Sequence, residues 1–179
     1  MVDGYKTGRK PIYTKESYID ENNIVDVLSR ALNIYSMNKW DINYLYNIYC
    51  GEQDIRLREK TVRPEINNKI AVNYANEIVT FKTGYFISNP IKISTDIDDQ
   101  KKREDLIAIN RYLRFIGKEN EDFKFVEWLH ICGVAYQIVV PYDKSEFKVD
   151  GIPFHIYTLD PRFTFVVRSN MPGNKVLMA

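Results

Sequence analysis

Residues Asn67–Ile93 read NNKIAVNYANEIVTFKTGYFISNPIKI and form one strongly patterned apolar segment. Large apolar side chains recur in it at spacings of four, four, three and four residues, which places them on one face of an α-helix. These residues are Ile70, Tyr74, Ile78, Phe81 and Tyr85. Smaller apolar residues widen the face, and so wide a surface predicts a helix that is covered on more than one side.

The sequence also marks both ends of this predicted helix. Asn67 or Asn68 can cap its start, because a short amide side chain accepts hydrogen bonds from the free N–H groups of the first turn. Gly84 can supply the left-handed residue that ends a helix. Pro90 excludes a simple helical continuation. The alternation that follows, in Ile91–Thr95, predicts a short half-buried strand.

Composition and charge limit the class of protein. The chain has 179 residues, which is enough for one domain with a sizeable core. Its net charge of +1 provides no global field that would attract nucleic acid or a membrane surface. Cys50 and Cys132 are far apart and predict free thiols in a cytoplasmic setting. No apolar run approaches the length of a membrane span, and the N-terminus lacks a secretory signal.

The part of the chain before the central segment is predicted to be helical after a polar start. Residues 1–16 indicate a flexible basic arm, and the alternative is an arm that becomes ordered on a partner subunit or on nucleic acid. Two helices are predicted over residues 17–38 and 41–50, and Gly51 ends the second. Residues 52–64 mix charges of both signs, which is typical of a solvated loop.

After the central segment the pattern changes from helix to strand. The acidic residues between 96 and 105 predict an exposed turn with a helix cap, and a divalent-cation site is the less favoured alternative. Helices are predicted over 106–117 and 120–132, and Gly133 ends the second. Short apolar runs then predict strands over 134–140, 147–149, 154–159, 163–167 and 175–179. The expected fold is α+β, with helical N-terminal two-thirds followed by an antiparallel β-sheet.

The chain ends inside a predicted hairpin, one short strand after the turn at residues 170–173. A natural domain is not expected to stop there. The sequence is therefore expected to be the N-terminal part of a longer protein, through choice of the expressed region, cleavage or a truncated gene.

No sequence motif for catalysis or for phosphate binding is found. G-x-x-x-x-G-K-[ST], G-x-G-x-x-G, H-E-x-x-H, C-x-x-C and G-x-S-x-G are all absent. His130 and Cys132 could be imagined as a nucleophilic pair, but residues two apart on a helix do not face each other. His155 lies between apolar neighbours on a predicted strand and faces the opposite side. The sequence predicts no enzyme, no cofactor and no metal site.

Four segments follow one another as WDINYLYNIYCGEQDIRLRE, NNKIAVNYANEIVTFKTGYFISNPIKI, WLHICGVAYQIVVPYD and LDPRFTFVVRSN. In this order they resemble the N-terminal half of a tailed-bacteriophage portal protein of the siphophage type. The match runs from about Trp40 to Ala179, and Cys50 stands where the family often has a polar or small residue. The matched motif positions are Tyr49, Gly51, Asp54, Ile55, Asn68, Lys69, Ile70, Asn73, Tyr74, Thr83, Gly84, Tyr85, Phe86, Pro90, Gly133, Tyr136, Asp160, Pro161, Phe165, Val166 and Val167.

The resemblance implies a structural, non-catalytic protein of the virion. Portal proteins form a ring, usually a dodecamer, at one capsid vertex, and DNA is packaged and ejected through it. Residues 17–179 would be a portal wing-like domain, with the C-terminal stem, clip and crown absent. The implied partners are other portal subunits, terminase, scaffolding and head-completion proteins, the major capsid protein and double-stranded DNA, without a membrane. The implied location is the portal vertex, and the host cytoplasm during assembly.

The matched positions have two interpretations. They can determine the fold, and some can also pack against a neighbouring subunit, because a ring needs two different contact faces on each copy. The candidate interface positions are Tyr49, Gly51, Asp54, Asn68, Lys69, Asn73, Tyr74, Thr83, Gly84, Tyr85, Gly133, Asp160 and Pro161.

Besides an enzyme that uses Cys132 or His130, which has little support, two alternative functions stay open at this point. The first is a nucleic-acid-binding module, in which the basic arm and four cations contact phosphate while tyrosines stack on bases. These cations are Arg56, Arg58, Lys60 and Arg63. The second is a truncated portal from a prophage or satellite element, which binds intact portal as a protein-binding module.

Overall fold

The computed structural model describes residues 10–96, 99–141 and 154–179. Its elements are β1 (Ile12–Thr14), α1 (Ile24–Tyr49), the 3₁₀ helix η1 (Asp54–Arg56), α2 (Tyr74–Phe86), α3 (Gln100–Phe115), α4 (Lys118–Cys132), β2 (Tyr136–Pro141), β3 (Phe154–Leu159), β4 (Val167–Ser169) and β5 (Val176–Met178). Helices dominate up to Cys132 and strands follow, so the predicted α+β fold is confirmed.

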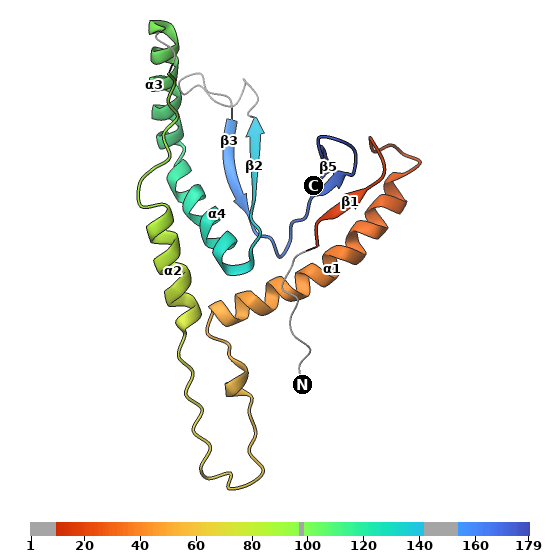
Figure 1. The fold of residues 1–179 in the computed structure, drawn as a ribbon, viewed down its shortest axis with the longest axis vertical. Helices are drawn as coiled ribbons and strands as arrows, with labels where there is room; N and C mark the ends of the chain where they lie inside the picture. Colours follow the sequence, from red (N-terminus) through yellow and green to blue (C-terminus); the bar gives the residue numbers. More distant parts are fainter. Residues whose placement is uncertain (1–9, 97–98, 142–153) are drawn as a thin grey trace.

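The helices form an open frame around two small sheets (Figure 1). α4 lies between α2 and the ribbon of β2 and β3, and α3 continues upward from the same side. α1 runs obliquely below them and reaches the sheet of β1, β4 and β5 at its N-terminal part. The chain between α1 and α2 extends below the helices as a long loop. Much of the helix surface is therefore left uncovered.

The strands of the described residues form two separate sheets rather than one antiparallel sheet. β2 and β3 pair antiparallel, in a register from Tyr136 with Leu159 to Pro141 with Phe154. In the second sheet β4 lies between β1 and β5, and it pairs antiparallel with β5 but parallel with β1. Two of the three strand pairs among the described residues are thus antiparallel, as expected, and the parallel pair arises because β1, from the start of the chain, forms one edge of the second sheet. The predicted strand over 147–149 lies outside the described residues.

β1 lies within the stretch for which the sequence indicated a flexible arm. Ile12 is only 6% exposed and packs with Val27, Ala31 and Val167 in one of two core clusters. This part of the expected arm is thus a strand of the core. The second cluster contains Ile42, Val79, Ile131 and Cys132. Since α1 contributes to both clusters, it is the helix that joins the two halves of the fold.

α1 is one continuous helix of 26 residues, where the sequence predicted two. It begins at Ile24 rather than at residue 17, after a turn in which the Asp20 carboxylate accepts from the backbone N–H of Asn23. The expected break falls at Asn38, which is buried inside the helix. Its side-chain amide accepts from the Lys10 backbone N–H and donates to the Lys10 carbonyl. The sequence pattern therefore predicted a helix end at a buried polar residue that in fact hydrogen-bonds to a distant segment of the chain.

α2 is shorter than predicted at its start. Asn73, rather than Asn67 or Asn68, caps it by accepting from the Asn76 backbone N–H at 3.2 Å. Gly84 lies within the helix instead of ending it, since α2 continues to Phe86. The chain from residue 57 to 73 has no helix or strand.

The strand predicted over residues 91–95 is not formed. The backbone N–H and carbonyl of Ile93 pair with the side chain of Asn110 on α3, at 3.0 and 2.8 Å. Because one amide side chain satisfies both groups, this segment needs no partner strand. Over residues 163–167 only Val167 belongs to a strand, and Phe163 is 73% exposed in a turn.

The remaining helix ends agree with the sequence analysis except at the start of α3, which is Gln100 rather than residue 106. The Asp99 carboxylate caps α3 by accepting from the backbone N–H groups of Lys101 and Lys102, as expected for an exposed turn with a helix cap. Gly117 separates α3 from α4, and Gly133 follows the last residue of α4. The helix predicted over 120–132 begins slightly earlier, at Lys118.

Candidate subunit interface

Three of the candidate residues meet where α1 ends and α2 begins. The Asn73 side-chain amide donates to the Tyr49 carbonyl at 2.9 Å while its oxygen caps α2. Gly51 lies directly beneath it with a φ of +88°, and a Cβ added there would stand 3.1 Å from the Asn73 amide nitrogen. A side chain at position 51 would therefore strain the backbone and would push against the Asn73 amide that binds the Tyr49 carbonyl. The three residues act as a joint that fixes the loop of residues 52–72 at both ends.

Tyr49 also links this joint to α4. Its hydroxyl donates to the Glu127 carboxylate at 2.9 Å. Burial, followed by the hydrogen bond to Glu127 and the charge of that residue, raises the pKa of Tyr49 to about 12. The phenol therefore stays protonated at neutral pH and donates to a carboxylate. Tyr49 is a structural link between helices, whatever further contacts it makes.

Thr83 holds the middle of α2 against α4. It is fully buried, and its hydroxyl lies 3.1 Å from Nδ1 of His130. Burial, and then the positive charge of Lys82, lowers the pKa of His130. The Cys132 thiol hydrogen-bonds instead to the Trp128 and Val134 carbonyls. His130 and Cys132 thus have different partners, as their spacing on the helix predicted.

Asp160 and Pro161 form a turn that depends on a residue the sequence analysis did not single out. The Asp160 carboxylate accepts from the backbone and the guanidinium of Arg162, with a shortest ion-pair distance of 2.6 Å. That guanidinium lies 3.9 Å from the ring centroid of Tyr46 and 5.4 Å from that of Trp128. Pro161 is fully buried beside it. The sequence signal for this cation–π contact was an arginine directly after an Asp-Pro turn, together with aromatic residues on two predicted helices.

The loop between α1 and α2 carries the predicted DNA-contact cations. Arg56, Arg58 and Arg63 are exposed, whereas the Lys60 ammonium donates to the Ile66 carbonyl at 3.1 Å. The ammonium of Lys69 similarly binds the Arg56 carbonyl at 2.8 Å. Two cations of the loop therefore stabilise its own backbone. DNA contact by the others stays a prediction.

Two other candidate positions, Asp54 and Asn68, lie within this loop. Asp54 opens η1 and Asn68 is exposed, and neither meets the joint formed by Asn73. The loop also exposes large apolar side chains, among them Leu57 at 82% and Ile70 at 73%. It projects from the frame in Figure 1 without an element packed on its far side.

The outer face of α2 is apolar and uncovered. We define it by Tyr74, Ile78, Phe81 and Tyr85, whose exposed fractions are 63%, 57%, 73% and 81%. The rings of Phe81 and Tyr85 stack at 6.4 Å. Only Val79 and Thr83 of this helix are buried, toward α4. The expectation that the helix is covered on more than one side is therefore wrong within a single copy of the chain.

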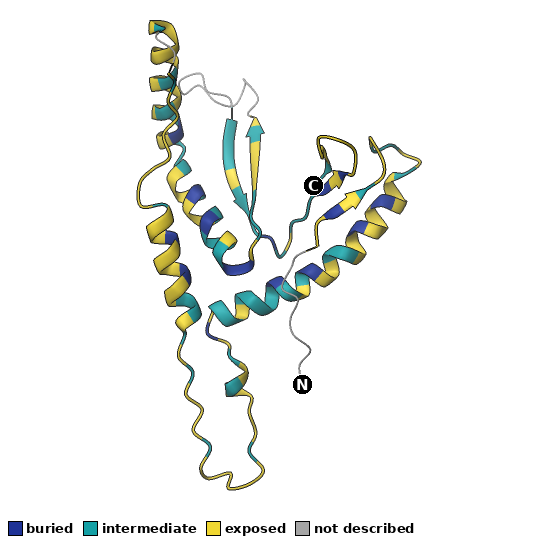
Figure 2. Ribbon diagram, in the orientation of Figure 1, coloured by how far each residue is buried: buried dark blue, intermediate teal, exposed yellow. Residues whose placement is uncertain are grey.

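A second apolar stripe is exposed on α1. It consists of Val25, Leu28, Leu32 and Trp40, with exposed fractions of 74%, 36%, 46% and 60%. The two surfaces belong to different helices, and in Figure 2 most residues of α2 and of the N-terminal half of α1 are coloured as exposed. Large apolar areas left exposed on separate elements are typical of proteins that bind partners.

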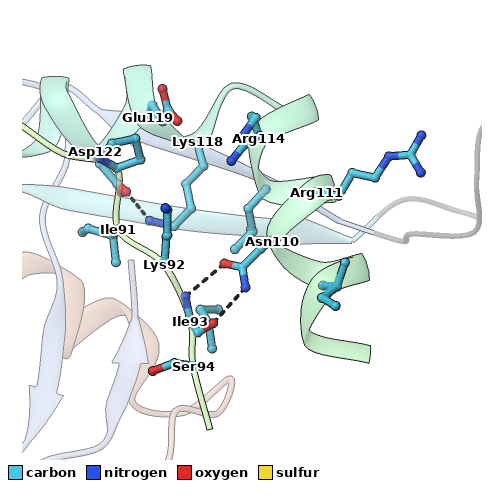
Figure 3. A pocket seen from close by; sticks show the side chains of 13 residues that line it. Ile91, Lys92, Ile93, Ser94, Asn110, Arg111, Arg114, Lys118, Glu119 and Asp122 are labelled. Carbon is cyan, nitrogen blue, oxygen red and sulfur yellow. Dashed lines mark hydrogen bonds and ion pairs between the residues drawn. The ribbon is translucent and has the colours of Figure 1, made fainter. Parts of the chain in front are cut away.

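A groove of about 440 Å³ lies between residues 90–94, α3 and the start of α4 (Figure 3). Its lining mixes cations, such as Arg111 and Arg114, with carboxylates. The Lys118 ammonium forms an ion pair with Asp122 inside it. Within residues 10–96, 99–141 and 154–179 no group of His, Cys, Asp and Glu is arranged to hold a metal ion. None of the helices within these ranges has both the length and the hydropathy of a membrane-spanning segment.

An open helical frame with two exposed apolar faces is typical of a protein that binds partners. The family model of phage portal proteins, SPP1 Gp6-like, matches residues 28–179. Because the match covers more than half of the chain, the chain belongs to this family. No curated protein matches it. Portal proteins are structural proteins of the bacteriophage capsid that form oligomeric rings and take part in DNA packaging.

Proposed function

We propose that this chain supplies a wing-like, non-catalytic part of a portal ring, built through contacts between unlike faces of neighbouring copies. The observation that carries the proposal is the pair of uncovered apolar faces, on α2 and on α1. A cyclic assembly of more than two copies uses two different patches on each subunit. The chain exposes two such patches on different helices, as a ring subunit requires.

The energetics of the faces support this role. Full burial of one large apolar side chain stabilises by about 1.5–3 kcal/mol. The outer face of α2 holds four such side chains, each more than half exposed in the single copy. At each interface, this gain is of the same order as the cost of fixing one subunit against the next.

The finer partners of the proposal follow from the role of a portal ring. Neighbouring copies would contact the α1 and α2 faces. Terminase, scaffolding and head-completion proteins, the major capsid protein and double-stranded DNA in the channel would contact other surfaces. Assembly would occur in the host cytoplasm, and the finished ring would lie at the portal vertex of the virion.

The mass of the purified chain in solution, measured by light scattering after size exclusion, tests the proposal. Electron microscopy of the same fractions then shows the shape of the particle. We expect closed rings of identical copies, at a mass many times the 21.1 kDa of one chain. A monomer, or a symmetric dimer that does not grow, would contradict the proposed role.

A further inference from the structure

The groove beside α3 has an apolar lining and one edge that is fixed by hydrogen bonds (Figure 3). Residues 90–94 form that edge, and Asn110 holds them to α3 by pairing with both backbone groups of Ile93. Four apolar side chains line the groove: Ile91, Ile93, Ile107 and Leu113. Leu113 is buried, whereas the three isoleucines are 45% to 68% exposed. The groove therefore offers apolar surface at a place where the backbone is held in position.

The charges of this groove are unbalanced. Its cations are Lys92, Arg111, Arg114 and Lys118, and its carboxylates are Glu119 and Asp122. Lys118 is paired with Asp122, and both of these side chains are largely buried. Among the residues that the structure describes, no carboxylate pairs with Lys92, Arg111 or Arg114. The groove thus holds three unpaired cations and one unpaired carboxylate.

The unpaired cations are spread along the groove rather than gathered at one point. Figure 3 shows the Lys92 side chain extended toward Lys118, and the Arg111 side chain extended outward from α3. Arg114 follows Arg111 by about one turn of the helix. Such a row of separate charges beside apolar side chains suits an elongated ligand that carries several negative groups.

This lining fits a patterned ligand better than a uniform polyanion. Double-stranded DNA carries closely and evenly spaced phosphates, so a strand in the groove would place some of them against Glu119 and against the isoleucines. A protein segment can place carboxylates beside the cations and apolar side chains over the isoleucines. A carboxylate can also accept two parallel hydrogen bonds from one arginine. The composition of the groove therefore favours an acidic peptide over DNA.

We propose that this groove binds an acidic segment of a partner protein, in which acidic and apolar residues are interspersed. Its carboxylates pair with Lys92, Arg111 and Arg114, and its apolar side chains cover Ile91 and Ile107. Charge complementarity selects this partner over others. The groove shares no residue with the apolar faces of α1 and α2, so the inference goes beyond the proposed function and does not require a ring.

Fluorescence anisotropy of two labelled peptides, titrated with the purified chain, tests the charge of the partner. The first probe repeats Asp-Leu-Glu-Val, and the second repeats Asn-Leu-Gln-Val, with the same apolar residues and no carboxylate side chains. We expect the acidic probe to bind about tenfold more tightly than the amide probe at low salt. Added salt should reduce this difference, because it screens exposed charges.

Two double variants test the position of the site. Arg111→Glu with Arg114→Glu should weaken binding of the acidic probe by about tenfold or more. Lys101→Glu with Lys102→Glu is the matched control, because it makes the same change of charge on α3 but outside the groove. It should leave binding nearly unchanged. Ile107→Gln, at an exposed position, should weaken binding of both probes through lost apolar contact. Circular dichroism checks that each variant is folded.

Three outcomes would overturn the inference. Equal binding of the acidic and amide probes would show that carboxylates do not direct the contact. Equal losses from the two double variants would show that only the overall charge of the chain matters. Displacement of the acidic probe by a short DNA duplex, with binding of that duplex lost in the Arg111 and Arg114 double variant, would assign the groove to nucleic acid.

Discussion

The two sides of α2 differ in a way that the sequence pattern conceals. Its inner side places Val79 and Thr83 against α4, exposed by 7% and 0%. Its outer side carries Phe81 and Tyr85, exposed by 73% and 81%. The larger, aromatic side chains therefore face away from the core that the described residues form.

This difference shows what hydrophobic periodicity measures. Apolar residues at helical spacing identify a face that is favourable to cover, but they do not identify what covers it. In a protein that assembles, the partner can be another copy. The inner side should then control folding and the outer side assembly, and the following substitutions separate the two.

The largest effect on folding is expected at Ile42, which packs in the same cluster as Val79 and is 2% exposed. Ile42→Ala should lower the free energy of unfolding by about 2–5 kcal/mol, because it leaves a cavity. Ile78→Ala removes the same side-chain atoms from the outer side of α2 and should cost about 0.5 kcal/mol or less. Urea unfolding of the dissociated chains, followed by circular dichroism, measures both. Equal losses would show that the outer side also supports the fold.

The joint between α1 and α2 should respond next most strongly. Gly51→Ala forces a side chain onto a residue with φ of +88° and against Asn73, and should cost about 1–3 kcal/mol. Gly117→Ala is the control, since its φ is +71° and the nearest atom to an added Cβ is at an ordinary 3.8 Å. The excess loss at Gly51 over Gly117, measured by thermal unfolding, reports the contact with Asn73. Equal losses for the two variants would show that contact between the added Cβ and Asn73 does not destabilise the fold.

Tyr49→Phe tests the link from the joint to α4 and should cost about 1 kcal/mol near pH 8 through the lost hydrogen bond. The pKa of Tyr49 is raised to about 12 in the folded chain, so the folded state holds this proton more tightly than the unfolded state. Its contribution is therefore present below about pH 10 and is lost as the pH rises through the folded pKa.

The phenylalanine variant should accordingly lose less stability than the wild type between about pH 10 and 12. Tyr74→Phe, at an exposed hydroxyl on the outer face of α2, is the control and should follow the wild-type curve. Identical alkaline slopes for Tyr49→Phe and the wild type would contradict the assignment.

The smallest effect is expected from His130 in mild acid. Burial lowers the pKa of its imidazole in the folded chain, so the unfolded chain binds a proton first as the pH falls below about 6.5. Stability should therefore decline from about pH 7 to 5, and His130→Asn should flatten this decline. Thermal unfolding at several pH values measures the difference between the two slopes. A His130→Asn curve parallel to that of the wild type would exclude the imidazole as the cause.

Much of the local structure was predictable because its causes are local. Gly51, Gly117 and Gly133 were recognised next to helix ends, and an aspartate was expected to cap the start of α3. The errors arose where a distant partner decides. Asn38 looked like a helix end but is buried and binds Lys10. The 91–95 segment looked like a strand but pairs with the Asn110 side chain.

The candidate interface positions could likewise be predicted only where their role is local. Their chemistry could be read from the sequence, but their contacts could not, because Asn73 meets Tyr49 across 24 residues and Thr83 meets His130 across 47. The role of Arg162 was missed for this reason, since the ring it stacks on belongs to Tyr46 on α1.

The amino-acid sequence by itself determined the α+β class, the order of helices before strands and the family to which the chain belongs, because propensity, periodicity and ordered motifs act along the chain. Only the tertiary structure decided which side of each helix is buried, since that depends on how α4 and the strands pack against it. It turned the aromatic face of α2 outward.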